Sequence, residues 1–308
     1  MTTTMMKAIR VQAYGGPEQL RFEDAPAPIA TRGHLLIRVR ATSVNPFDLK
    51  LASGMFKDMI PMTLPYVPGG EFAGVVEDVP LDVTGLKKGD EVFGNCPAGA
   101  YAQLVAAPAD TVAPKPAKLS FVESACLPLA GQTAWQALFD QGQLQRGQTV
   151  LIHAGAGGVG SYAVQLAHWT GARVLATASG EGVAYVKSLG ADQTIDYKTT
   201  RFESVAKDVD LVVDLLGGDT QARSFGVLKK GGRLISTVQP PPQDVANKQG
   251  VHAAFFSMKP SSPGLIRLAE LVDSGDLKVN VAKTYPLRDA ATAWRESAHA
   301  RGKTALEV

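Results

Sequence analysis

The sequence has few cysteines, no excess of one charge and no long apolar run. Its 308 residues contain only two cysteines, Cys96 and Cys126, so neither a disulfide framework nor a multi-cysteine metal site is indicated. There are 31 basic and 29 acidic residues, without a basic block, which gives no support to a nucleic-acid partner. No stretch approaches the roughly 20 apolar residues that span a bilayer, and the N-terminus lacks the apolar core of a signal peptide. We therefore expect a cytoplasmic protein with no membrane partner.

The length suggests two domains, and the residue pattern changes near residue 120. Before it, short β-like runs such as 35–41 and 72–79 are separated by Pro and Gly, which suggests a β-barrel-like domain. After it, apolar strands alternate with helical stretches, which indicates parallel βαβ units. We also expect one helix over 123–140, a loop over the proline run at 239–243 and a strand over 277–281.

A glycine-rich turn carries the strongest chemical signal. Gly155, Gly157 and Gly160 are spaced as G-x-G-x-x-G, directly after an apolar strand and directly before a helical stretch. The first glycine permits a tight turn, the second lets the backbone approach a pyrophosphate, and the third lets the helix pack on the strand. The N–H groups at the helix start then hold phosphates. We predict a dinucleotide site on these glycines together with Gly158 and Val159.

The end of the next strand bears on the choice of nicotinamide cofactor. An NAD site usually presents Asp or Glu there to the ribose 2′-hydroxyl, whereas this strand ends at Ser179 without a carboxylate. Ser179 and Tyr197 can donate hydrogen bonds to a 2′-phosphate, and Lys198 follows. Glu181 argues the other way, and Ser179 also suits a helix N-cap. We predict that NADPH is preferred over NADH.

An ordered series of motifs runs through nearly the whole chain. It comprises Ser43-Val44-Asn45-Pro46, Pro68-Gly69-Gly70-Glu71-Phe72, Gly89-Asp90-Glu91-Val92, Leu127-Pro128-Leu129-Ala130-Gly131, Leu189-Gly190-Ala191-Asp192 and Arg301-Gly302-Lys303-Thr304. The series resembles the medium-chain dehydrogenase/reductase superfamily, in its zinc-independent, quinone-oxidoreductase-like (zeta-crystallin-like) branch. The resemblance implies an α/β fold: a GroES-like β-barrel domain over 1–120 and 265–308, and a Rossmann NADPH-binding domain, a doubly wound parallel sheet, over 121–264. The active site would then lie in the cleft between them.

The resemblance also bears on zinc. Zinc alcohol dehydrogenases of this superfamily place a cysteine where this chain has Asn45 and a histidine where it has Gly70. Neither residue is a strong zinc ligand, and the lobe of closely spaced cysteines is absent. We therefore expect no zinc. Without that Lewis acid, quinones and α,β-unsaturated carbonyls fit better as hydride acceptors than the zinc route of alcohol oxidation.

Several side chains receive roles from the same resemblance. Asn45, the catalytic candidate, either donates a hydrogen bond to an acceptor oxygen that gains negative charge or forms a structural Asn-Pro turn. Asp48 and Glu71 are expected to orient other groups. No residue stands out as a general acid: water or a cleft tyrosine, such as Tyr66, could give the proton, and the sequence does not decide between them. The implied cofactor contacts beyond the glycine turn are Asn45, Thr133, Ser179, Tyr197, Leu216, Gly217, Ser236, Thr237, Phe255 and Lys303.

Three more of these contacts, besides Asn45 and Ser179, have a plain structural alternative. Thr133 could bond its own helix backbone, Phe255 could belong with Phe256 to a core, and Lys303 could be solvated.

The leading functional hypothesis is NADPH-dependent reduction of a quinone or an α,β-unsaturated carbonyl. The alternatives are trans-enoyl thioester reduction and non-catalytic NADPH binding. Similar proteins pair through the edge of the Rossmann sheet, so we expect a homodimer that uses either residues 233–238 or the strand near Phe255.

Overall fold

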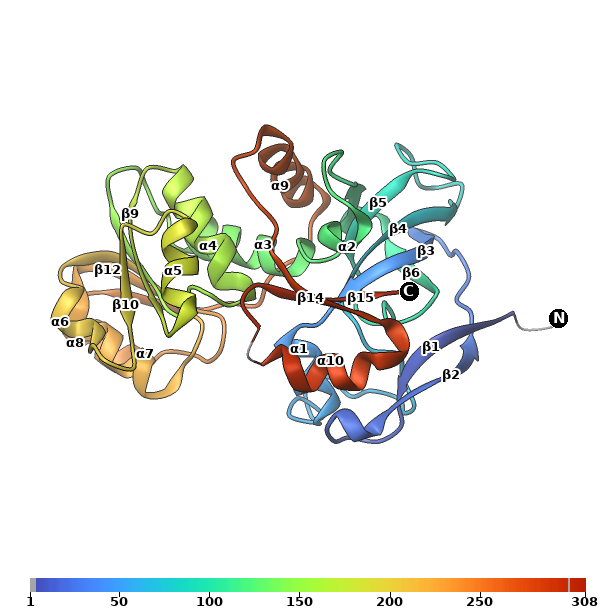
Figure 1. Ribbon diagram of the computed structural model, residues 1–308, viewed down its shortest axis with the longest axis horizontal. Helices are drawn as coiled ribbons and strands as arrows, with labels where there is room; N and C mark the ends of the chain where they lie inside the picture. Colours follow the sequence, from blue (N-terminus) through green and yellow to red (C-terminus); the bar gives the residue numbers. More distant parts are fainter. Residues whose placement is uncertain (1–3, 299) are drawn as a thin grey trace. The chain divides into compact units, whose positions relative to one another are not determined.

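The computed structural model describes residues 4–298 and 300–308. The chain divides into two compact units. The first takes Met1–Leu129, Pro260–Ser274 and Val279–Val308, and the second takes Ala130–Lys259 and Gly275–Lys278. The first unit is thus assembled from both ends of the chain, and the second from its middle (Figure 1).

The first unit is a β structure with short helices. Its strands are β1 (Met5–Val11), β2 (Leu20–Pro26), β3 (His34–Ser43), β4 (Glu71–Asp78), β5 (Glu91–Asn95), β6 (Leu104–Pro108), β7 (Val112–Pro114), β14 (Val281–Pro286) and β15 (Lys303–Glu307). The larger sheet has the order β14-β15-β3-β4-β5-β7, β6 also pairs with β3, and β1 and β2 form a ladder of their own. The helices are α1 (Pro46–Ala52), α2 (Phe121–Ser124), α9 (Ser262–Ser274) and α10 (Ala290–Ser297).

Strand register in the first unit places three strand ends at one edge of the sheet. Ala305 pairs with Ser43, and Thr42 pairs with Phe72. The end of β3, the start of β4 and the start of β15 therefore meet, which brings Glu71 and Lys303 next to the residues that lead into α1.

The second unit is a six-stranded parallel sheet covered by helices. Its strands are β8 (Thr149–Ile152), β9 (Arg173–Ala178), β10 (Gln193–Asp196), β11 (Val209–Asp214), β12 (Leu228–Ser236) and β13 (His252–Phe255), in the order β10-β9-β8-β11-β12-β13. The helices are α3 (Pro128–Trp135), α4 (Gly158–Trp169), α5 (Glu181–Ser188), α6 (Phe202–Val205), α7 (Gly218–Ser224) and α8 (Gln243–Gln249).

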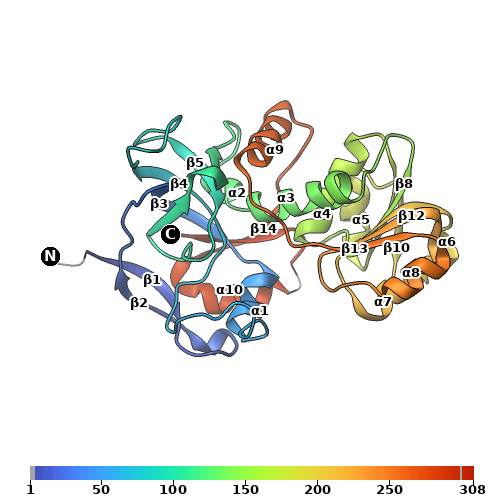
Figure 2. The ribbon, with the colours of Figure 1, turned by 180° about the vertical axis from the view of Figure 1, so that it is seen from behind.

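The strand order of this sheet explains where its helices lie. From β8 the chain moves outward to β9 and β10, and then returns to β11 and moves outward in the opposite direction. Right-handed crossovers therefore place α4 and α5 on one face and α7 and α8 on the other, as Figures 1 and 2 show. The order changes direction between β8 and β11, which is where open α/β sheets bind ligands.

Some local expectations were wrong. The single helix expected over 123–140 is α2, then α3 beginning at Pro128, then a π-helical segment, Gln136–Gln141. Pro128 lacks a backbone N–H, so it starts a helix rather than continuing one. The strand expected over 277–281 is β14, at Val281–Pro286. The loop over 239–242 is confirmed, and α8 begins at Gln243. Within residues 4–298 and 300–308, no helix has the length and apolar character to cross a bilayer.

Candidate active site

The predicted glycine turn connects β8 to α4 in the second unit. Gly157 is the N-cap residue of α4, and no side chain caps the helix there. A Cβ atom built on Gly157 would meet only Ala154 O, at 3.3 Å. The twelve-residue helix α4 therefore presents uncapped N–H groups, with Gly158 and Val159 in its first turn, at a point where the backbone is open to approach.

The other two glycines are required by close packing. A Cβ atom on Gly160 would lie 2.1 Å from Ala154 O, so this helix can approach the strand only with glycine here. A Cβ atom on Gly155 would lie 3.0 Å from Ala176 Cβ, on β9. The left-handed residue of the turn is Ala154, with φ 52°. Gly155 is therefore needed for contact with β9 rather than for a positive φ.

Ser179 and Tyr197 come together at the carboxyl end of β9. The Ser179 hydroxyl donates to Tyr197 Oη at 2.9 Å, and Tyr197 N–H donates to Ala178 O at 3.1 Å. Tyr197 remains 58% exposed. The N-cap of α5 is Gly180, so the expectation that Ser179 caps this helix was wrong. Glu181 is the first residue of α5.

Asp214, at the end of β11, organises the next part of the sheet edge. Its buried carboxylate accepts the N–H groups of Leu216 at 3.1 Å and Gly217 at 2.8 Å, and the Ser236 hydroxyl at 2.8 Å. Thr237 N–H donates to Asp214 O at 3.2 Å. Three predicted contact residues thus donate to the Asp214 carboxylate, and a fourth, Thr237, donates to the Asp214 backbone carbonyl. The sequence reasoning missed Asp214, although an acidic residue between an apolar strand and two glycines was a visible signal.

The remaining predicted contacts of the second unit differ in exposure. Thr133 is buried in α3. Phe255 is 42% exposed on β13, and Phe256 is half-buried, so neither is a plain core residue.

His153 is buried and packed: its ring nitrogens lie 3.3 Å from Thr177 Oγ1 and 2.8 Å from Ser224 Oγ. Burial lowers the pKa of His153 to about 4, which makes it a neutral structural group.

In the first unit, Asn45 and Lys303 belong to one buried polar cluster around Glu71. Lys303 Nζ donates to Asn45 Oδ1 at 2.5 Å, to Glu71 Oε1 at 3.0 Å and to Val44 O at 3.1 Å. Lys303 is 3% exposed and Glu71 is fully buried. Lys303 is therefore not solvated, which rules out that alternative.

Glu71 has a full set of partners in this cluster. Besides Lys303, its Oε1 accepts Asn45 Nδ2 at 2.7 Å and the Ser43 hydroxyl, and its Oε2 accepts Leu129 N–H at 2.7 Å. One amide hydrogen of Asn45 is thereby committed to Glu71. Asn45 is also the N-cap residue of α1, so it has a structural role whatever else it contacts.

Asp48, in the first turn of α1, is the second carboxyl group of this cluster. Its Oδ2 accepts Asn45 N–H at 3.1 Å. Burial raises the pKa of Asp48 to about 7, the charge of Glu71 adds to the increase, and Lys303 opposes it. Two carboxyl groups and one ammonium group thus share a site that holds a proton near neutral pH.

Metal ligands are not gathered at this cluster. Asn45 offers an amide that is already bonded to Glu71 and Lys303, and Gly70 has no side chain. In the part of the chain that the structure describes, no three His, Cys, Asp or Glu side chains are grouped so as to hold a metal ion.

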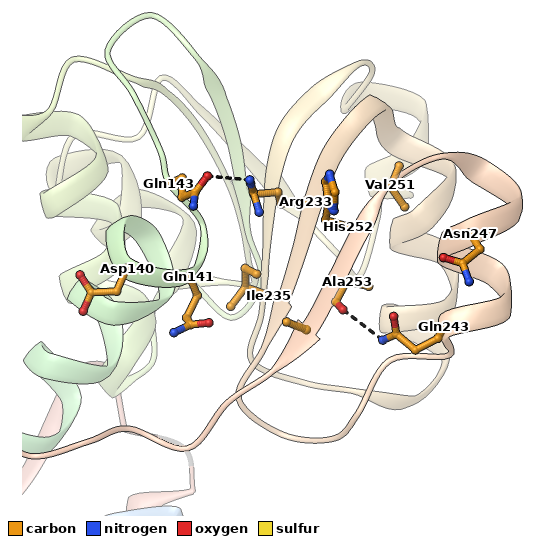
Figure 3. Close-up of a pocket in the computed structure, with 11 residues that line it drawn as sticks. Asp140, Gln141, Gln143, Arg233, Ile235, Gln243, Asn247, Val251, His252 and Ala253 are labelled. Carbon is orange, nitrogen blue, oxygen red and sulfur yellow. Dashed lines mark hydrogen bonds between the residues drawn. The ribbon is translucent and has the colours of Figure 1, made fainter.

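A separate hollow of about 370 Å³ lies along β12 and β13 in the second unit (Figure 3). Arg233 Nη2 donates to Gln143 Oε1 at 2.6 Å on one side of it, and Gln243 Nε2 donates to Ala253 O at 3.0 Å on the other. None of the predicted site residues lines it. The hollow follows the edge strand β13 and is distinct from the glycine turn.

Comparison with known sequence families gives two matches. Residues 31–117 match the family described as "Alcohol dehydrogenase GroES-like domain", and residues 189–306 match the one described as "Zinc-binding dehydrogenase". Together the matches cover most of both units.

Individual relatives align over almost the whole chain. A mouse (Mus musculus) quinone oxidoreductase is 32% identical over 97% of this chain and 96% of its own length. The structure of a quinone oxidoreductase from Coxiella burnetii has 36% identity and a TM-score of 0.91, covering 99% of this chain and 100% of that one. The Escherichia coli quinone oxidoreductase complexed with NADPH has 29% identity and a TM-score of 0.90, over 98% and 100%.

Proposed function

Because this chain belongs to the quinone-oxidoreductase-like branch of the medium-chain dehydrogenase/reductase superfamily, we propose that it is an NADPH-dependent oxidoreductase that reduces quinones or α,β-unsaturated carbonyls. When bound, NADPH supplies a hydride from its nicotinamide ring. The observation that carries the proposal is the uncapped start of α4 on the glycine turn.

The residues of this turn fit the pyrophosphate of a dinucleotide. The N–H groups at the start of α4 point at a position where Gly157 leaves the backbone accessible, and the positive end of the helix dipole favours phosphate there. Gly155 and Gly160 allow the strand, turn and helix to pack closely enough to form this surface. Leu216 and Gly217, fixed by Asp214, would border the adenosine, and Ser236, Thr237, Phe255 and Thr133 the nicotinamide.

The preference for NADPH over NADH is supported by the end of β9. The paired hydroxyls of Ser179 and Tyr197 offer hydrogen bonds to a 2′-phosphate, and Lys198 adds a positive charge. An NAD site would carry a carboxylate at this strand end. The NADPH complex of the Escherichia coli relative agrees with this choice. Calorimetric titration with both nucleotides tests the preference: NADPH should bind more tightly, and equal affinity would contradict it.

We propose that the enzyme works without zinc. The matched family description names zinc, yet Asn45 and Gly70 supply neither thiolate, imidazole nor carboxylate. Elemental analysis of the purified chain should find no stoichiometric zinc, and a chelator should leave turnover intact. One tightly held zinc per chain would overturn this part of the proposal.

The chain's own polar groups would stabilise the acceptor. Asn45 Nδ2 carries two hydrogens, and Glu71 takes one of them. The other can donate to a carbonyl oxygen that gains negative charge as hydride arrives. Lys303 would hold the amide in this orientation through its contact with Asn45 Oδ1.

We further propose a homodimer formed at β13. Residues 233–238 are not an edge, because β12 lies between β11 and β13. β13 is an edge strand with Phe255 exposed and the hollow of Figure 3 beside it, and an uncovered strand edge tends to associate. Light scattering should give twice the chain mass; a monomer at all working concentrations would refute the dimer.

The activity is tested by NADPH oxidation against a panel of quinones, enones and enoyl thioesters. Enoyl thioesters belong in the panel because they are activated carbonyls too, and turnover confined to them would favour a trans-enoyl thioester reductase. NADPH binding without turnover on any acceptor would favour the non-catalytic alternative.

A further inference from the structure

Exposed apolar side chains are concentrated between Phe47 and Met62, in α1 and the segment that follows it. This stretch holds three of the seven methionines of the chain, all within residues 55–62, the methionine segment. Four large apolar side chains of the stretch are exposed, namely Phe47 (40%), Met55 (64%), Met59 (74%) and Ile60 (40%). Single exposed apolar residues are common on proteins, whereas a group of them marks a binding surface.

The methionine segment folds back along α1 toward the end of the helix that carries Asn45. Met55 N–H donates to Lys50 O at 3.2 Å. The Phe56 ring then stacks on the Phe47 ring, with 5.8 Å between the ring centroids and 28° between the planes. Phe47 lies in the first turn of α1, two residues after the N-cap residue Asn45, and two residues span at most about 7 Å. The stacked rings therefore lie beside the residue proposed to contact the acceptor.

Hydrogen bonds hold the rest of the methionine segment in place. The N–H groups of Met59 and Ile60 both donate to Phe56 O, at 3.0 and 2.7 Å. Met62 N–H donates to Tyr14 Oη at 3.3 Å, and the half-buried side chains of Phe56 and Met62 pack against the core of the first unit. The exposed side chains are thus carried on an ordered backbone, so an apolar group can bind to them without the cost of ordering the segment first.

The composition of the methionine segment selects the kind of ligand. It contains one basic and one acidic residue, Lys57 and Asp58, and so carries no net charge. Attraction to an acidic lipid surface depends on clusters of basic residues, and a charged ligand needs a charge of the opposite sign. Methionine side chains are flexible and polarisable, and they adapt to apolar groups of different shapes. A neutral aliphatic chain fits this surface.

We propose that Phe47 and the methionine segment bind an aliphatic side chain of the acceptor while Asn45 contacts its carbonyl oxygen. This inference rests on the proposed function and narrows the substrate class to quinones and enones that carry a chain of several carbons. The chain lies outside the reacting atoms, so its binding stabilises the bound substrate and the transition state equally. It should therefore lower KM and leave kcat unchanged.

The first test varies the chain and keeps the quinone ring. Trimethylbenzoquinones whose fourth substituent runs from methyl to hexyl share the same reacting carbonyl groups, and their full substitution prevents the addition of thiols. Complete burial of one methylene group strengthens binding about fourfold, and a surface that covers one side of the chain should give about twofold. KM should therefore fall about 30-fold from the methyl to the hexyl quinone, while kcat changes less than about twofold.

The second test removes the apolar character of the methionine segment and keeps its shape. Glutamine has nearly the length of methionine, and Met55 and Met59 are exposed, so the double variant Met55→Gln with Met59→Gln should fold normally. Its KM for the hexyl quinone should rise on the order of tenfold, whereas kcat and the KM for the methyl quinone stay unchanged. The double variant Met55→Leu with Met59→Leu should keep the preference for the hexyl quinone.

The matched control is Met5→Gln. Met5 is an exposed methionine (53%) of the same unit and lies on β1, outside the methionine segment. Both KM values should be those of the wild type. Methionine methyl signals give a readout that does not depend on turnover. In the full chain with carbon-13-labelled methionine methyl groups, the hexyl quinone should shift the signals of Met55 and Met59, assigned with the glutamine variants, and leave that of Met5 in place.

The outcomes separate this inference from the proposed function. A KM that does not depend on chain length, in a wild-type chain that reduces these quinones, would overturn the role of the methionine segment and leave the reductase function standing. No turnover with any acceptor would overturn the function and this role with it. Equal rises of KM for the methyl and hexyl quinones in the glutamine double variant would mark a general structural effect and contradict the proposal. Loss of a dimer, or of binding to phosphatidylcholine vesicles, in that variant with unchanged KM values would assign the segment to a subunit contact or a membrane surface and also overturn it.

Discussion

Replacing Lys303 with methionine should strongly destabilise the first unit. The change keeps an unbranched side chain but removes the ammonium group that bonds to Glu71 Oε1, Asn45 Oδ1 and Val44 O. Glu71 is fully buried, so its carboxylate would lose its counter-charge where water cannot replace it. Breaking a buried ion pair from one side costs about 3–5 kcal/mol, out of a typical free energy of unfolding of about 5–15 kcal/mol.

A second variant separates the ion pair from general damage. In the double variant Lys303→Met with Glu71→Gln, the buried charge is gone. Asn45 Oδ1 is no longer bonded to Lys303, so once the Asn45 amide group has flipped, this oxygen can accept a hydrogen bond from the Gln side-chain amide. The double variant should therefore unfold at a higher denaturant concentration than the single one. Its side chains are uncharged and hydrogen-bonded, so folding does not bury an unpaired charge.

Tryptophan fluorescence can report this unit alone. The chain has three tryptophans. Trp294 is buried in the first unit, where its indole N–H donates to Tyr101 Oη at 3.2 Å, whereas Trp135 and Trp169 lie in the second unit. In a Trp135→Phe, Trp169→Phe background, urea unfolding follows Trp294. Stability of Lys303→Met within 1 kcal/mol of the parent (roughly the mean effect of any substitution), or a double variant weaker than the single one, would refute this reasoning.

Three further changes have defined outcomes. Gly160→Ala should destabilise the second unit by about 3 kcal/mol or more, since its Cβ would lie 2.1 Å from Ala154 O; wild-type thermal unfolding would contradict this. The pKa of Asp48 in the folded chain, about 7, exceeds its ordinary 3.8. Its contribution to the free energy of unfolding is therefore full at acid pH and is lost as pH rises through about 7, on the order of 4 kcal/mol in all. The free energy of unfolding of Asp48→Asn should lack this pH dependence. Asn45→Ala should lower kcat about 100-fold at unchanged NADPH affinity, and a change confined to KM would remove Asn45 from the reaction.

The family and the fold class predicted from the sequence are confirmed. They could be predicted because each rests on local signals: apolar strands, a glycine turn, and motifs in a fixed order. Segment boundaries were less certain where a single residue decides them, as at Pro128, which starts α3 instead of lying inside the one helix expected over 123–140.

The buried cluster could not be predicted, because it depends on strand register. Lys303 and Glu71 are 232 residues apart in the sequence, and only the pairing of β15 and β4 with β3 brings them together. Likewise, the sequence assigned Asp48 an orienting role, since its burial beside a second carboxyl group is visible only in three dimensions. The roles of the individual cofactor contacts stay predictions.

Direct hydride transfer is measured most clearly with NADPH carrying deuterium at nicotinamide C4. The purified chain is incubated with each stereospecifically labelled form and an enone, and the product is analysed by mass spectrometry and NMR. One labelled form should place one deuterium on the β-carbon of the product, with none exchanged into water. Loss of the label to solvent from both forms, or no oxidation of NADPH by any acceptor, would contradict an NADPH-dependent reductase.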